Sequence, residues 1–179
     1  MNAFFKRSTL NVNMIRNYFI LLVLIWIISA CINSDEQISF EKDAFKTPES
    51  FTETNNAGEI ISEDKDDWRV SPFYLNVVEV FRPAYPNPTV VQYITVEFLV
   101  SGIESVSGLV CYVLRQDRSL SQVYRNSNDV LPTGLISVQL DPSLFAYAGT
   151  ISGAQGLHRL LFYDINDRLI TYGDVKIEQ

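Results

Sequence analysis

The chain has 179 residues, of which 47% are hydrophobic, and its 21 acidic and 14 basic residues give a formal net charge of −7. Lysine and arginine form no cluster, so the chain lacks the basic face that binding to phosphate groups requires. This composition argues against nucleic acid or an anionic bilayer surface as a direct partner.

The N-terminal region is typical of an export signal. Basic residues precede an apolar core over residues 18–28, and the small residues Ser29 and Ala30 follow it. The apolar core has about a dozen residues, whereas a permanent transmembrane helix needs about 20. An uncleaved signal anchor is the alternative interpretation, and Met14 is an alternative start of the chain.

The tetrad Ile28-Ser29-Ala30-Cys31 resembles the lipobox of bacterial lipoproteins. The resemblance implies that residues 1–30 are a signal peptide and that Cys31 becomes the lipidated first residue of the mature protein. Several acyl chains together hold a protein firmly on a membrane. Ile32 follows the cysteine, so the aspartate associated with inner-membrane retention is absent. We therefore expect the bacterial outer membrane, with the periplasmic and the outward-facing orientation both open.

Residues 31–68 are predicted to form a flexible acidic tether behind the lipidated cysteine. Between Ile32 and Trp68 the chain carries 11 acidic and three basic residues, without sustained periodicity. Such a segment buries too little apolar surface to offset its ordering entropy, and its charges favour extension. The alternative is that the isolated aromatic residues of this segment dock on a partner: Phe40, Phe45 and Phe51.

Residues 69–179 are predicted to form one all-β domain. This length suffices for one hydrophobic core and is too short for two. Strand-like segments occur at residues 73–81, 91–100, 109–115, 120–124, 135–140, 157–163 and 169–177. About seven strands without an amphipathic helix favour an antiparallel β-sandwich of immunoglobulin or fibronectin type III kind. A small β-barrel is the alternative.

Alternation with a period of two predicts which strand residues face the core. The predicted core comprises Ile94, Val96, Phe98, Cys111, Val113, Leu160 and Phe162. Cys111 has no partner once Cys31 is lipidated, so we expect a small buried thiol and no disulfide within the chain. Residues 164–168 are rich in Asp and Asn, which predicts the turn of a closing hairpin.

The segment Ala84-Tyr85-Pro86-Asn87-Pro88 and the strands after it resemble the start of the Ig-like domain of flagellar hook-capping proteins. The same segment is similar to the start of the C-terminal sorting domains of type IX secretion cargo. The resemblance implies an Ig-like fold for the region from Pro83 onward. It implies no function here, since a lipid anchor already determines the destination.

No motif for catalysis, metal binding or phosphate binding is present. His158 is the single histidine and shares a strand face with Leu160 and Phe162, which is typical of a core or rim position. The acidic run at residues 63–67 lacks the glycine and the ligand spacing of a calcium loop. The sequence therefore predicts no catalytic residue, no metal, no cofactor and no enzymatic activity.

The domain contains many tyrosines, and outward-facing ones are candidate partner-binding residues. We single out Tyr93 and Tyr124, because exposed tyrosine rings stack on sugars or anchor protein partners. Cross-strand packing is the alternative role. The resulting hypothesis is a non-enzymatic, lipid-anchored Ig-like module for protein–protein interaction or envelope assembly. Glycan binding at the cell surface is the alternative function.

Overall fold

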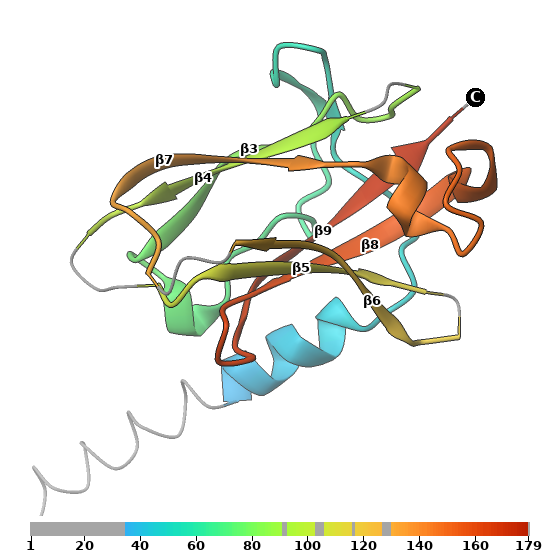
Figure 1. Ribbon diagram of the computed structural model, residues 1–179. Helices are drawn as coiled ribbons and strands as arrows, with labels where there is room; N and C mark the ends of the chain where they lie inside the picture. The colour runs from blue at the N-terminus through green and yellow to red at the C-terminus, as the bar shows by residue number, and fades with distance from the viewer. Residues whose placement is uncertain (1–34, 91–92, 103–105, 116, 127–129, 179) are drawn as a thin grey trace, which may run out of the picture.

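The structure is a computed structural model that describes residues 35–90, 93–102, 106–115, 117–126 and 130–178. Two antiparallel sheets face each other, with the strand orders β3-β4-β7 and β6-β5-β8-β9 (Figure 1). The strands are β3 (Val78–Tyr85), β4 (Ile94–Val100), β5 (Leu109–Leu114), β6 (Leu120–Asn126), β7 (Gly134–Leu140), β8 (Gly156–Tyr163) and β9 (Leu169–Ile177). A separate hairpin of β1 (Glu53–Thr54) and β2 (Ile60–Ser62) precedes them. The described part of the chain also contains three 3-10 helices, η1 (Pro72–Tyr74), η2 (Pro142–Phe145) and η3 (Ser152–Ala154), and an N-terminal helix at residues 35–44.

The predicted all-β sandwich of about seven strands is confirmed. The seven longer strands form two separate sheets, which distinguishes the fold from a closed barrel. The fourth of these strands, β6, pairs with β5 in the four-stranded sheet. In an immunoglobulin constant domain the fourth strand lies in the other sheet, beside the fifth. The sandwich thus departs from that arrangement by placing one edge strand in the opposite sheet.

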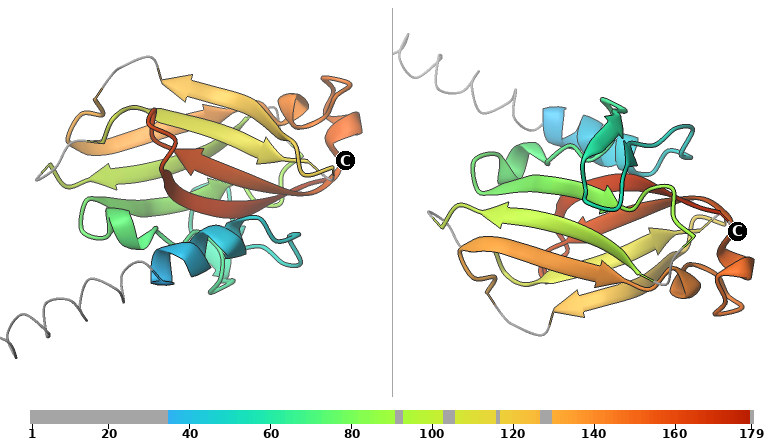
Figure 2. Two further views of the ribbon diagram at one scale, coloured as in Figure 1. Left: turned by 90° about the horizontal axis from the view of Figure 1, so that it is seen from below. Right: turned by 90° about the horizontal axis from the view of Figure 1, so that it is seen from above.

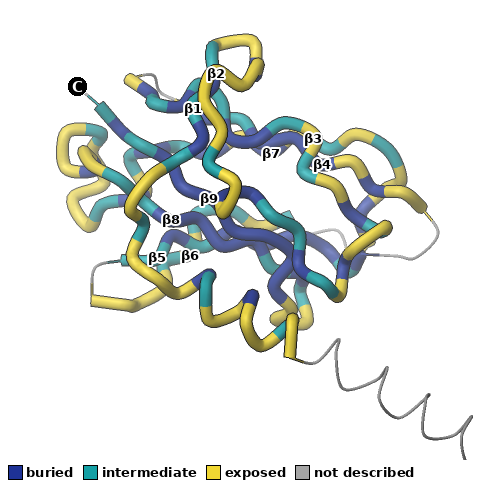
Figure 3. The backbone as a smooth tube through the Cα atoms, turned by 180° about the vertical axis from the view of Figure 1, so that it is seen from behind, coloured by how far each residue is buried: buried dark blue, intermediate teal, exposed yellow. Residues whose placement is uncertain are grey.

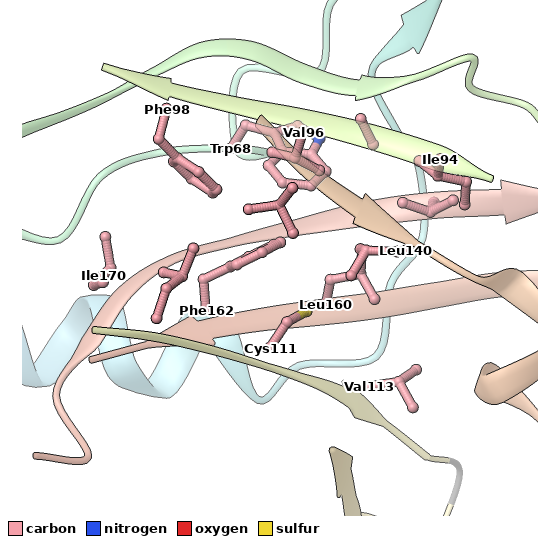
Figure 4. Close-up of a cluster of buried hydrophobic side chains, with 14 of the residues drawn as sticks. Trp68, Ile94, Val96, Phe98, Cys111, Val113, Leu140, Leu160, Phe162 and Ile170 are labelled. Carbon is pink, nitrogen blue, oxygen red and sulfur yellow. The ribbon is translucent and has the colours of Figure 1, made fainter. Parts of the chain in front are cut away.

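The predicted core is confirmed, because all seven predicted residues have at most 1% of their surface exposed. Figure 4 shows their side chains converging between the two sheets. The rings of Phe98 and Phe162 pack edge to face with their centroids 5.1 Å apart. Cys111 is a buried free thiol whose pKa is raised by its burial. Alternation along the strands therefore identified the side chains that hold the sheets together.

The predicted turn between β8 and β9 is confirmed. The Oδ1 atom of Asp164 accepts hydrogen bonds from the backbone N–H groups of Asn166 and Arg168, both at 2.9 Å. Asp167 adopts a positive φ of 61°, a conformation that Asp and Asn tolerate better than most residues. The side chains of the turn therefore satisfy its own backbone groups.

The strand expected at residues 73–81 is displaced along the chain. Residues 72–74 form η1, in which the Ser71 side chain accepts a hydrogen bond from the Phe73 N–H and Pro72 supplies the fixed φ of a helix start. The strand β3 begins at Val78 and continues through Pro83 instead of ending there. A proline is tolerated because β3 is an edge strand whose register shifts around Arg82.

The prediction of a flexible tether is wrong for residues 35–68. Residues 35–44 are helical, and we call them the N-terminal helical segment. Figure 1 shows this segment below the four-stranded sheet, on the face turned away from the three-stranded sheet, and Figure 2 shows it running along the β9 side. Phe40 and Ala44 are 5% and 0% exposed, and they pack with Leu161, Leu169 and Tyr172. Figure 3 accordingly shows β9 buried along most of its length and β8 buried from Arg159 to Phe162. The signal peptide and Cys31 lie outside the described residues.

Residues 67–71 lie along the edge of β9 and close it. The N–H of Trp68 donates to the Tyr172 carbonyl at 3.0 Å, and the N–H of Ser71 donates to the Ile170 carbonyl at 2.8 Å. The Trp68 ring enters the core directly over Gly173, where an added Cβ would lie 2.2 Å from the ring. An occupied strand edge cannot pair with another chain. Residues 67–71, at the end of the acidic region, therefore complete the sandwich.

Phe40 provides a test of this docking. Phe40→Ala removes the aromatic ring that packs on Tyr172, with centroids 5.1 Å apart, and leaves a cavity under the helical segment. We expect the free energy of unfolding to fall by about 3 kcal/mol, measured by urea denaturation of the purified protein. The matched control is Phe45→Ala, since Phe45 is 40% exposed and an exposed substitution typically changes stability by less than about 0.5 kcal/mol. Equal, small effects of both substitutions would contradict the docking.

Candidate functional site

A polar cleft of about 630 Å³ lies where the N-terminal helical segment ends against the outer face of the four-stranded sheet. It is lined by charged side chains of both signs from the helical segment, the loop before Trp68, β8 and β9. The charged residues that line it are Asp43, Lys46, Glu49, Asp64, Asp66, Arg69, Arg118, Arg159 and Asp174. The contacts of these groups determine whether the cleft has charge available for a ligand.

Arg159 connects β8, β9 and the N-terminal helical segment. Its Nε and Nη2 atoms donate to the two carboxylate oxygens of Asp174 at 2.8 and 2.6 Å. Its Nη1 atom donates to the carbonyl oxygens of Asp43 and Lys46 at 2.9 and 3.0 Å. The guanidinium also lies 4.9 Å from the centroid of the Tyr172 ring. Arg159 thus caps the carbonyl end of the helical segment while it remains paired within the sheet.

A second cluster of paired charges lies around Asp43. The Nζ atom of Lys46 lies 2.7 Å from one carboxylate oxygen of Asp43, and an Nη atom of Arg69 lies 3.3 Å from the other. The hydrogen bond and charge of Lys46, with a smaller contribution from Arg69, lower the pKa of Asp43. Arg69 also donates to the Tyr172 hydroxyl at 2.6 Å. The charged groups of this cluster therefore bind one another and hold the segment in place.

Asp67 is a buried carboxyl group at the edge of β9. Its two oxygens accept hydrogen bonds from the backbone N–H groups of Thr52 and Asp174, at 2.9 and 2.7 Å. Burial raises the pKa of Asp67 to about 7, and the neighbouring charge of Asp174 adds to the increase. Asp67 therefore links the segment before β1 to β9 through its backbone contacts.

Asn87, the asparagine of the Tyr85–Pro88 segment, joins the same two regions. Its side chain is fully buried and its Nδ2 atom donates to the carbonyls of Thr52 and Asp174, at 2.8 and 2.9 Å. Its Oδ1 atom accepts from the Lys176 N–H at 2.9 Å. All three contacts are with backbone groups, so they depend on the path of the chain and not on neighbouring side chains. The motif that suggested an Ig-like start thus has a structural role in this chain.

The two predicted partner-binding tyrosines, Tyr93 and Tyr124, differ in exposure and lie at strands of different sheets of the sandwich. Tyr93 immediately precedes β4 and is 51% exposed. Tyr124 lies opposite Cys111 on β6 and packs against the core between the sheets. Tyr147, which the sequence analysis did not single out, is 78% exposed, and the guanidinium of Arg115 lies 3.7 Å from its ring centroid. Its position in a loop, outside any strand alternation, gave no signal in the sequence.

His158 lies at the rim of the core, as its alternation with Leu160 and Phe162 predicts. Its Nε2 atom lies 2.6 Å from the Ala154 carbonyl oxygen, and its ring packs against that of Phe145. Burial lowers the pKa of His158. Over the described residues, no group of three or more His, Cys, Asp or Glu side chains is arranged to hold a metal ion. The same part of the chain contains no helix with the length and apolar character of a membrane span.

Comparisons with known proteins do not assign the chain to a family. No protein-family model and no curated protein matches it. Solved structures with a partial likeness include an LPMO from Kitasatospora papulosa at 17% identity and T.fusca AA10A at 14% identity, each with a TM-score of 0.35. The likeness covers 49% and 50% of this chain, and about half the length of each of those chains. A likeness this limited bears on neither the fold nor the chemistry of this protein.

Asp67 predicts a pH dependence of stability. The folded state holds a proton on Asp67 up to about pH 7, whereas the unfolded chain loses it near the ordinary value of 3.8. The folded state therefore binds more protons than the unfolded chain between these two pH values. The contribution of Asp67 to stability is complete below pH 3.8 and is lost as the pH rises through 7. We expect a decline of a few kcal/mol in the free energy of unfolding, measured by urea denaturation between pH 4 and pH 8.

The matched control is Asp67→Asn, which cannot titrate but loses one hydrogen-bond acceptor. It should be less stable than the wild type at pH 4, and the difference should narrow toward pH 8. A constant difference across this range would contradict the buried titration of Asp67. Taking the difference also removes the contributions of other titrating groups, including His158.

Proposed function

We propose that the chain is a non-enzymatic lipoprotein of the bacterial cell envelope that presents its β-sandwich for protein–protein interaction or envelope assembly. The observation that carries the proposal is the position of the tetrad ending at Cys31, immediately before the folded part of the chain. Only four peptide steps separate Cys31 from Asp35, the first described residue of the N-terminal helical segment. The lipid would thus attach almost directly to the folded body.

Because residues 35–68 are folded onto the sandwich, the linker between the anchor and the domain is short. Four residues span at most about 14 Å even when fully extended. A domain of this size has a radius of gyration of about 15 Å. The anchor therefore holds the domain within about one radius of gyration of the membrane, and not at the end of a long extended linker. Partners are reached by the surfaces of the sandwich itself.

The sheet edges indicate which surfaces are available for partners. The edge of β9 is occupied by residues 67–71 and by Thr89, whose N–H donates to the Lys176 carbonyl. Within the described part of the chain, β6 and β7 are the outer strands at the other side of the sandwich, and neither pairs with a further strand. Edge strands accept an added strand from a partner through backbone hydrogen bonds. Leu135 on β7 is 55% exposed and adds an apolar contact to this edge.

The polar groups of the described residues support a non-enzymatic role. The carboxyl groups of Asp67 and Asp174, the guanidinium of Arg159 and the ring of His158 each contact other parts of the chain. General acid–base chemistry requires such a group to reach a substrate proton. Here these groups fix the positions of chain segments.

The anchor is tested on protein purified from the membranes of cells that produce the full chain. We expect an intact mass that lacks residues 1–30 and includes acyl chains. In denaturant one thiol should react with maleimide, that of Cys111, because the sulfur of Cys31 would be a thioether. The substitution Cys31→Ser should abolish acylation, whereas the control Cys111→Ser should retain it. Residues 1–30 still attached, with two reactive thiols, would refute the anchor.

The interaction role is tested by placing a photo-crosslinking amino acid at Gln139, an exposed residue of β7. In intact cells we expect an adduct with one discrete envelope protein. The adduct should be lost with Cys31→Ser, because the module then leaves the membrane. The matched control places the same crosslinker at Leu144, which is 46% exposed on η2. The same set of adducts from both positions, or none from Gln139, would count against a partner at this edge.

A further inference from the structure

We propose that the end of the sandwich that carries η1 rests on the membrane surface, with the exposed side chains of Phe73 and Leu75 in the lipid headgroup layer. This inference rests on the lipid anchor at Cys31 proposed above. It adds which face of the body meets the bilayer and which residues make the contact.

The first step is where the chain enters the described body. The Oε1 atom of Gln37 accepts hydrogen bonds from the Ser71 hydroxyl at 2.8 Å and from the Phe73 N–H at 3.3 Å. These bonds place the first turn of the N-terminal helical segment beside η1, and Figures 1 and 2 show the two elements next to each other. The chain therefore leads from Cys31 into the body at the end where η1 lies.

The second step is distance. Cys31 lies at the membrane surface if its acyl chains are inserted, and Asp35 lies within about 14 Å of it. The body is wider than this linker is long. The end with η1 is thus brought to the headgroups, whereas the opposite end, with η2 and η3, is held away from them.

The third step is the character of this end. Phe73 and Leu75 have 55% and 57% of their surface exposed, and Ile38 on the adjacent helical turn has 49%. Leu75 also lines an open, mainly apolar hollow of about 330 Å³ together with Val77 and Leu99. Transfer of such side chains from water to the membrane interface is favourable. Because this end is already held near the membrane, lipid is the molecule that covers its large exposed apolar side chains.

The charges nearby indicate what kind of lipid contact this is. Asp35 and Glu36 are exposed at the same end, so anionic headgroups would be repelled. One cation is close to the apolar residues, since the Arg168 guanidinium lies 4.6 Å from the ring centroid of Phe73. A long basic side chain can keep its charge among the headgroups while neighbouring apolar groups insert. The contact should therefore form on zwitterionic bilayers without anionic lipid.

The experiment uses the full chain, processed in cells and purified from membranes, with an environment-sensitive fluorophore on a single introduced cysteine. The probe is attached to Leu75→Cys, and the matched control is Tyr147→Cys at the opposite end, where Tyr147 is 78% exposed. Cys111 is fully buried and stays unlabelled in the folded protein. The labelled proteins are reconstituted in phosphatidylcholine vesicles that contain a lipid with a quencher on its headgroup. Phe73→Cys is a second probe should Leu75→Cys fail to fold.

We expect severalfold stronger quenching at position 75, or at position 73, than at position 147. Equal quenching at both ends, on protein whose intact mass shows the acyl chains, would overturn the inference and leave the anchor intact. A fluorophore at position 75 that is shielded from water but not quenched would also overturn it, since a protein would then cover this end. Protein without acyl mass would instead refute the anchor itself, so the two failures are distinguishable.

Discussion

The contact of Arg159 with Asp174 and with two carbonyl groups of the N-terminal helical segment determines the architecture of this protein. One guanidinium satisfies a carboxylate on the neighbouring strand and the end of a helix. Removing one partner of a buried ion pair typically costs about 3–5 kcal/mol, because the other charge is left without compensation. The outer face of the four-stranded sheet therefore has a fixed cover, whose apolar part is supplied by Phe40 and Ala44.

This cover makes the acidic N-terminal region an integral part of the domain. Trp68 fills space in the core above Gly173, and Asp67 and Asn87 fix the path of the preceding segment by hydrogen bonds to backbone groups. A substitution of Gly173 by any larger residue would require the indole to move. Because the segment is held at several points, the distance between the sandwich and Cys31 is set by four residues. Both the proposed anchoring and the proposed membrane contact follow from that short distance.

Much of the sandwich could be predicted from the sequence, because its signals are local. The alternation in Ile94, Val96 and Phe98 identified the inward faces, and the Asp and Asn residues after Tyr163 identified the last hairpin. The predicted start of β3 was wrong. The apolar residues of 73–81 resemble a strand, but Ser71 and Pro72 begin a 3-10 helix before it. The capping serine and the proline were the available signal.

The N-terminal region was misjudged for a different physical reason. Its average composition is acidic and polar, yet Gln37, Phe40 and Ala44 recur at the spacing of one helix face. Three such residues are too few to form a core alone. Phe40 and Ala44 are buried only because a matching face of β8 and β9 lies elsewhere in the chain. Likewise, nothing local marks Arg159 as the residue that caps a helix over a hundred positions earlier. Long-range pairing of this kind is not visible in one sequence.

The central claim, that residues 35–71 fold with the sandwich, is tested most directly by hydrogen–deuterium exchange of the intact protein. The amides of Thr52, Trp68 and Ser71 donate to partners within the domain. They should exchange as slowly as amides in β8, because they open only when the domain unfolds. If these three amides exchanged at the rate of an unstructured chain while β8 remained protected, the acidic region would be a tether after all.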